Sequence, residues 1–247
     1  MLTAALVFAL QVSAPALIST LDAGKLKGEP TQLAWSADGT QVFLQTNERD
    51  RSGMVKTPRY FVMSAADGKP RAVDAAPVWA TEYWAWKSNQ YAPGSNTFGI
   101  DIKQDERTIS STSSAMGGAL AKGAVATDPT AGTTADEVMN HAAQSQQVRV
   151  FSLTLKEGVK GEVVGEFVGQ QFLPGYTFGW SPGGLGMIAY TNSSGRLAIA
   201  GKDGQKQQVD STKNVLLPAW SPDGSRIAFL QRAGKNAYEL YVVAVKQ

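Results

Sequence analysis

Short apolar runs alternate with clusters of turn residues along most of the chain. The run "IAFL" at residues 227–230 and the run "LYVVAV" at residues 240–245 are separated by polar and glycine residues. Apolar runs of four to eight residues that are bounded by Gly, Pro and Asp are typical of buried strands. The pattern predicts an all-β fold made of short strands joined by tight turns.

One phrase recurs with small changes: "AWSADGTQVFL" from Ala34, "GWSPGGLGMIAY" from Gly179 and "AWSPDGSRIAFL" from Ala219. In the last copy, Ser221, Pro222 and Gly224 occupy positions that a type I turn prefers for these residues. Gly39 has the place of Gly224 in the first copy. Because apolar stretches lie on both sides of the turn, each copy predicts a hairpin.

More strand and turn signals follow each hairpin, which predicts units of four short strands. Trp220 follows Trp180 by 40 residues, and propeller blades repeat at about 40–45 residues. A weaker copy contains Trp86, 51 residues after Trp35. The sequence therefore predicts a β-propeller of about four four-stranded blades, near residues 30–74, 75–168, 169–210 and 211–247.

The ring is expected to close with a strand from the other end of the chain. The last unit ends on its third strand, and the N-terminal segment "LISTLDAGKLKGE" can supply the fourth, which removes an exposed sheet edge. A half-ring that oligomerises is the alternative. Residues expected to have structural roles in the repeat are Trp35, Trp86, Trp180, Trp220, Gly39 and Gly224.

A segment rich in Ala, Ser, Thr and Gly interrupts the second unit at residues 104–146. Its first part reads as a flexible insertion. Residues 134–137 match a capping box and predict a short helix that continues to Ala143. The segment is either a functional loop or a tolerated surface insertion.

Residues 1–16 resemble a secretory signal peptide, with an apolar run that ends at the small residues Ala14-Pro15-Ala16. The run is too short to span a bilayer, and a buried N-terminal strand is the alternative. The sequence thus predicts a single domain at 17–247, periplasmic or secreted, without a transmembrane segment. A net charge of +2 with no basic run disfavours nucleic acid as a partner. The chain has no cysteine.

The sequence offers little catalytic chemistry. Residues 179–183 match G-x-S-x-G, but Pro182 follows the serine and has no N–H for an oxyanion hole. The single histidine, His141, lies in the polar insertion. Asp38 and Asp223 are explained by turns, although a calcium site built from such carboxylates stays open. We expect no enzyme activity, no cofactor and no catalytic or metal residue.

The densest aromatic cluster is "WATEYWAW" at residues 79–86. By analogy with the other units, Glu82, Tyr83 and Trp84 are expected on the innermost strand, near the channel. Tyr176 and Phe178 occupy the comparable stretch of the next unit. Exposed aromatic residues can anchor partners, so these five residues are the candidate partner-binding set. Ordinary packing of an irregular blade is the alternative.

The residues from Trp220 to Gly224, followed by "RIAF" and "LYVV", resemble the repeat of the TolB-type bacterial β-propellers. The resemblance implies a periplasmic protein-binding platform whose partner is an envelope or secreted protein. The N-terminal domain of the periplasmic Tol component is absent from this sequence. The alternative function is a small-ligand-binding or enzymatic propeller that uses the central channel.

Overall fold

A computed structural model of the chain describes residues 10–48, 55–89, 100–110, 145–168, 177–183, 186–234 and 236–246. The chain separates into two compact units. The first comprises Met1–Asp101, Thr154–Gly165 and Leu173–Gln247. The second comprises Ile102–Leu153 and Glu166–Phe172.

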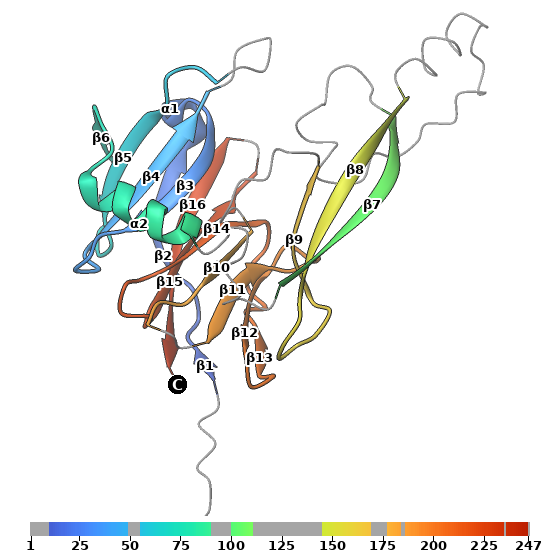
Figure 1. Ribbon diagram of the computed structural model, residues 1–247. Helices are drawn as coiled ribbons and strands as arrows, with labels where there is room; N and C mark the ends of the chain where they lie inside the picture. Colours follow the sequence, from blue (N-terminus) through green and yellow to red (C-terminus); the bar gives the residue numbers. More distant parts are fainter. Residues whose placement is uncertain are drawn as a thin grey trace, which may run out of the picture. The chain divides into compact units, whose positions relative to one another are not determined.

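The first sheet of the first unit is an antiparallel meander of four consecutive strands (Figure 1). Its strands are β3 (Glu29–Trp35), β4 (Gln41–Asn47), β5 (Arg59–Ser64) and β6 (Arg71–Val73). The hairpin of β3 and β4 places Trp35 opposite Val42. It brackets the first copy of the repeated phrase, as the apolar runs on both sides of the turn predict.

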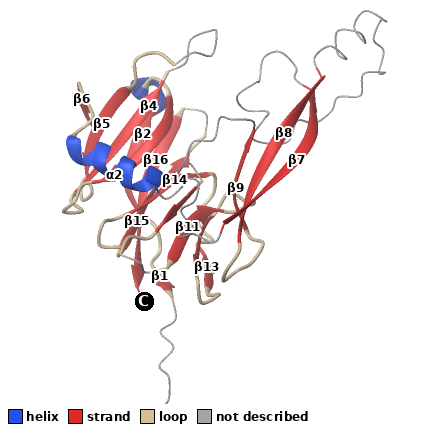
Figure 2. Cartoon of the chain, in the orientation of Figure 1, coloured by secondary structure: helices blue, strands red, loops and turns tan. Residues whose placement is uncertain are grey.

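The other two copies also form hairpins at the start of a sheet. One sheet consists of β10 (Phe178–Trp180), β11 (Met187–Thr191), β12 (Leu197–Gly201) and β13 (Lys206–Gln208). The next begins with β14 (Val215–Trp220), β15 (Arg226–Arg232) and β16 (Ala237–Lys246). Strands joined by short turns dominate the first unit, as Figure 2 shows, so the all-β prediction holds.

The N-terminal segment completes the last of these sheets. Strand β2 (Ala16–Asp22) pairs antiparallel with β16, with Leu21 opposite Tyr238. This is the place that the sequence assigned to a strand from the N-terminal segment. The two-residue strand β1 (Gln11–Val12) pairs with the end of β16, and the short helix α1 (Ala23–Leu26) follows β2.

A three-stranded sheet is built from β7 (Ile100–Ser110), β8 (Ser145–Leu155) and β9 (Val163–Val168). Residues 104–110 and 145–146, which were expected in the insertion, belong to these strands. No Gly or Pro interrupts residues 100–110, so the strand continues past the predicted boundary. The predicted short helix at 134–143 and His141 lie outside the described residues.

The aromatic cluster forms a helix, so the prediction of an innermost strand at Glu82–Trp84 is wrong. Helix α2 spans Val78–Asn89 and lies against β3 (Figure 1). The reason is local: Pro77 precedes the first turn, its carbonyl accepts the N–H of Ala80, and no Gly or Pro interrupts the segment. Trp86 consequently lies on a helix with 37% of its surface exposed. The structural role expected for Trp86 by analogy with the strands of the other copies is therefore not the one that it has.

Two clusters of buried apolar side chains stabilise the first unit. One joins β3, β4 and β5 to α2 and to the sheet of β14–β16, and it includes Trp35 and Leu217. The other joins the sheet of β10–β13 to the sheet of β14–β16, and it includes Trp220 and Phe229. The sheet that begins with β14 therefore packs on both neighbouring sheets.

Candidate functional site

The first and last copies of the repeated turn use the same hydrogen bonds. In the first, the Ser36 hydroxyl donates to Asp38 at 2.5 Å, and the Asp38 carboxylate accepts the Thr40 N–H at 3.0 Å. In the last, Ser221 donates to Asp223 at 2.5 Å, and Asp223 accepts the Ser225 N–H at 3.1 Å. Both carboxylates are therefore engaged inside their own turns.

These bonds stabilise the charged form of each carboxylate. The pKa of Asp38 is lowered to about 2, mainly by the hydroxyl of Ser36 and then by Thr40. The pKa of Asp223 is lowered to about 2 by the hydroxyls of Ser221 and Ser225. Each of the two carboxylates thus has a structural explanation that needs no metal ion.

The repeat tryptophans connect one sheet to the next. The indole N–H of Trp35 donates to the carbonyl oxygen of Ala219 at 2.9 Å, and that of Trp220 donates to Gly179 at 2.9 Å. Each acceptor is the residue just before the tryptophan of the neighbouring copy. Trp180, the tryptophan after Gly179, is itself 6% exposed.

Arg226 adds a second connection between two copies. Its guanidinium carbon lies 4.7 Å from the centre of the Trp35 ring, and its Nη2 donates to the carbonyl oxygen of Gly39 at 2.9 Å. Gly39 has φ +67°, and a Cβ there would lie 2.5 Å from Nη2. Gly224, the corresponding residue, has φ +71°. Glycine is favoured at both positions because other residues resist this conformation.

Ser181, inside the G-x-S-x-G match, has the same turn role as Ser36 and Ser221. Its hydroxyl oxygen accepts the N–H of Met187 at 3.1 Å, and its side chain is buried. Gln41 N–H and Arg226 N–H donate in the same way to Ser36 and Ser221, each at 2.9 Å. The match to the hydrolase pattern therefore follows from the repeat.

The best-defined polar arrangement in the interior joins α2 to β14. The hydroxyl of Tyr83 donates to the carbonyl oxygen of Trp220 at 2.7 Å. One turn later, the ammonium group of Lys87 donates to the carbonyl oxygen of Pro218 at 2.9 Å. A register shift between Leu216 and Ala219 interrupts the ladder with β15 at this point, which leaves the Pro218 carbonyl for Lys87.

Burial dominates the electrostatics of both anchoring side chains. Lys87 is 2% exposed, and burial lowers its pKa to about 7. Burial also raises the pKa of Tyr83, which keeps its hydroxyl as a donor. Lys87 Nζ lies 5.9 Å from the centre of the Trp84 ring. Gly179 leaves room for the lysine, because a Cβ there would be 3.3 Å from Lys87 Cε.

The five predicted partner-binding residues do not form one surface. Tyr83 is buried, Trp84 is half-buried and Glu82 is exposed, because consecutive residues of a helix point in different directions. Phe178 is fully buried on β10. Tyr176 lies outside the described residues.

The exposed face of α2 is instead formed by residues that the sequence reading had not grouped. Val78 is 74% exposed and Trp86 is 37% exposed, and Glu82 is exposed between them. The Trp86 ring contacts the ring of the anchored Tyr83 edge-on at 5.4 Å between centroids. Val78, Glu82 and Trp86 are four residues apart, so a prediction of a helix from the sequence would have placed them on one face.

Other kinds of site receive no support from the described part of the chain. Within it, no three His, Cys, Asp or Glu side chains gather as a metal site would require. None of the helices described there is long and apolar enough to cross a membrane. Comparison with models of protein families and with curated proteins finds no match. The resemblance to TolB-type repeats therefore stays a prediction.

Proposed function

We propose that this chain is a non-enzymatic β-propeller of the TolB-like type that binds a protein partner through the outer face of α2. Each of the four sheets then corresponds to one blade. The sheets of β3–β6 and of β10–β13 have four strands, the sheet of β14–β16 has five with β1 and β2, and the sheet of β7–β9 has three. The hydrogen bonds of Trp35 and Trp220 support a repeated blade-to-blade connection.

The observation that carries the proposal is the combination of a fixed inner face and an apolar outer face on one helix. Tyr83 and Lys87 fix α2 to the backbone of β14. The opposite side presents Val78 and Trp86 to solvent. A rigid helix pays little conformational entropy when it binds, and exposed tryptophan is enriched at binding hot spots.

The chemistry of this face favours a protein partner. Val78 and Trp86 offer apolar area, and Glu82 is the charged residue among them. We expect a partner with apolar side chains and a lysine or arginine opposite Glu82. The signal-like residues 1–16 and the TolB-like repeat support a partner in the periplasm or outside the cell.

The test is a photo-crosslinking residue placed at position 78 of the chain. In envelope extract, a specific partner is expected to crosslink at position 78, and the crosslink should be lost in Trp86→Ala and Glu82→Lys. The matched control is a crosslinker at Val55, which is 48% exposed on another segment. A crosslink within the chain, between two copies, or equally from both positions would contradict the proposal.

The variants are chosen so that loss of binding is not loss of folding. Tyr83→Ala and Trp84→Ala are poor choices, because Tyr83 is an anchor and Trp84 contacts Lys87. Substitution at exposed surface positions usually changes stability by less than about 0.5 kcal/mol. A thermal melt of each variant checks this point.

A further inference from the structure

A cleft lies far along the chain from α2, at one end of the sheets of β10–β13 and β14–β16. The loop after β13 and the turn between β15 and β16 border a cleft of about 560 Å³. Its lining residues come from this loop, the end of β15, the turn and β16: Ser211, Lys213, Asn214, Gln231, Arg232, Ala233, Gly234, Glu239 and Tyr241. The lining is mainly polar, which distinguishes it from the outer face of α2.

Positive charge exceeds negative charge in this cleft. Lys213 and Arg232 are exposed, and neither forms an ion pair with a carboxylate of the described residues. The Arg232 guanidinium lies 5.9 Å from the centre of the Tyr238 ring. The one carboxylate of the lining, Glu239, accepts the hydroxyl of Tyr241 at 2.9 Å. Two cations against one carboxylate leave the cleft suited to a single negative charge.

Gln231 provides an amide donor in the same cleft. Its side chain is 6% exposed, and its Oε1 accepts the N–H of Lys213 at 3.0 Å. That bond occupies the oxygen of the side-chain amide and leaves its nitrogen for other partners. The amide nitrogen makes no hydrogen bond to another described residue, and it is not closed off from solvent, so it is available to a ligand in the cleft. A ligand oxygen can accept a hydrogen bond from it.

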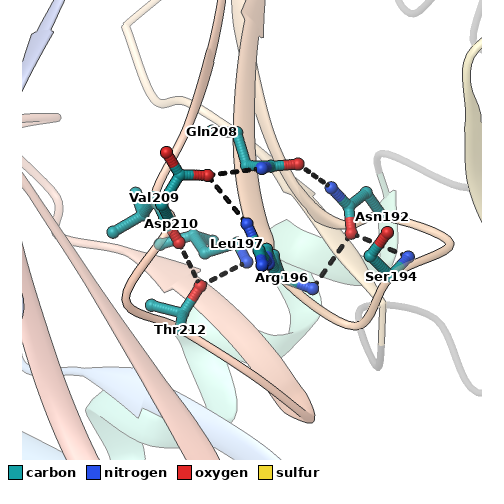
Figure 3. A network of polar contacts seen from close by, with 8 residues as sticks. All are labelled: Asn192, Ser194, Arg196, Leu197, Gln208, Val209, Asp210 and Thr212. Carbon is teal, nitrogen blue, oxygen red and sulfur yellow. Dashed lines mark hydrogen bonds and ion pairs between the residues drawn. The ribbon is translucent and has the colours of Figure 1, made fainter.

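The wall that carries Ser211 and Lys213 is already held in place. Figure 3 shows the contacts that fix it: the Thr212 hydroxyl donates to the carbonyl of Val209 at 2.6 Å and accepts the N–H of Leu197 at 2.9 Å. Beside it, Arg196 and Asp210 form an ion pair at 2.8 Å. Donors on a fixed loop lose little freedom when a ligand binds.

From this arrangement we infer that the cleft binds a carboxylate group through Lys213, Gln231 and Arg232. A carboxylate offers two oxygens in one plane, which suits a guanidinium together with an amide N–H and an ammonium group. A single negative charge also matches the charge balance of the lining. This site is independent of α2, so either proposal can fail without the other.

The test is a titration followed by NMR of the side-chain amide of Gln231 and the guanidinium of Arg232. The probes are butyrate, a peptide acetyl-Gly-Glu-Gly-amide whose one charge is a glutamate carboxylate, and inorganic phosphate. Saturable shifts with butyrate or with the peptide support the inference, and the tighter of the two identifies a free or a peptide-borne carboxylate. No saturation, or tighter binding of phosphate than of both, overturns it.

Four variants connect the binding to the named residues. Lys213→Gln and Arg232→Gln are each expected to weaken binding about tenfold, the loss of one charge-assisted hydrogen bond. Gln231→Glu keeps an acceptor for the Lys213 N–H but replaces the donor with a negative charge, so binding should be lost. Arg71→Gln removes an exposed cation from β6 and should change nothing. Unchanged binding in the first three, with native backbone spectra, would overturn the inference.

Discussion

The ammonium nitrogen of Lys87 lies 2.9 Å from the carbonyl oxygen of Pro218, inside the first compact unit. A lysine that is 2% exposed is unusual, because burial disfavours the charged form. The bond is possible because β14 changes register at this point and its backbone leaves the ladder with β15. The register shift in β14 thus leaves a backbone carbonyl that a side chain of helix α2 binds.

Lys87 makes the stability of the protein depend on pH in a defined direction. Its pKa is lowered by burial from 10.5 to about 7, so between these values the unfolded chain binds more protons than the folded chain. The free energy of unfolding therefore rises as pH increases from about 7 to about 10.5. Lys87→Met should remove this rise, which urea denaturation of both proteins across that range would measure.

The quantity to compare is the difference between the two proteins, because other groups titrate as well. The difference should change steadily across the range and be constant at lower pH. Lys25→Met, at an exposed position of α1, is the matched control and should follow the native chain. A difference between native chain and Lys87→Met that does not vary with pH would show that Lys87 is not buried in this way.

The two inter-sheet tryptophan bonds should contribute equally to stability. Trp35→Phe and Trp220→Phe keep an aromatic ring but leave the carbonyls of Ala219 and Gly179 without the indole donor. An unsatisfied buried polar group costs about 1–3 kcal/mol, to which the smaller ring adds a packing loss. Chemical denaturation should show similar losses for both variants and little change for Trp86→Phe. A neutral Trp220→Phe would mean that this bond does not hold the sheets together.

Local sequence chemistry was sufficient for the hairpins but insufficient for α2. The turn preferences of Ser221, Pro222 and Gly224 specify a hairpin wherever they occur. The segment 78–89 contains no Gly or Pro to indicate a turn, and its Trp, Tyr and Ala residues are compatible with a strand or a helix. The analogy with the other copies favoured the strand, whereas the segment after Pro77, which has no Gly or Pro, forms a helix.

The site was harder to predict than the fold, because it depends on contacts between distant residues. Lys87 was overlooked since a lysine in a sequence suggests a solvated position, and its partner Pro218 is remote in the chain. The turn segments around Lys213 and Arg232 carry no motif, and only the pairing of β14, β15 and β16 brings them together. Tyr83 was selected for its aromatic ring, yet its function in the fold is to anchor a helix.

The turn carboxylates should stabilise the chain at neutral pH and lose this effect in acid. The pKa values of Asp38 and Asp223 are lowered from 3.8 to about 2 by hydroxyl and N–H donors, so the folded chain binds fewer protons than the unfolded chain between these values. Asp38→Asn combined with Asp223→Asn should lower the denaturation midpoint near neutral pH. The gap to the native chain should close as pH falls from 3.8 to about 2.

A single exposed turn provides the control for this experiment. Asp67 accepts the N–H of Lys69 at 3.3 Å and accepts no hydroxyl from another described residue, so Asp67→Asn should change the midpoint much less. A gap that is independent of pH would indicate that the asparagine variants act through packing and not through charge.

Gly39 should be the less replaceable of two glycines with positive φ. Gly39 and Gly161 have φ of +67° and +81°, but a Cβ at Gly161 meets no atom within 4 Å, whereas one at Gly39 meets Arg226. Gly161→Ala should cost about 1–2 kcal/mol for the left-handed conformation alone, and Gly39→Ala more. In an Arg226→Ala background the two costs should become similar, which denaturation of the double variants would measure. Costs that already match in the native background would contradict the role of Arg226.

Strand β2 should be required for folding, whereas the residues before it should not. A chain that begins at Leu17 keeps the pairings of Leu21 with Tyr238 and of Ser19 with Leu240, and it corresponds to removal of the signal-like residues 1–16. It should fold with a modestly lower midpoint, since β1 is lost.

A chain that begins at Ala23 loses Leu21, which is 1% exposed in the core, and exposes the edge of β16. Burial of one leucine contributes about 1.5–3 kcal/mol, and an uncovered edge promotes association. Denaturation and size-exclusion chromatography should therefore show a stable monomer for the first chain and an unfolded or aggregated second. Equal behaviour of the two chains would mean that β16 does not depend on β2 and that the N-terminal strand is not needed to complete this sheet.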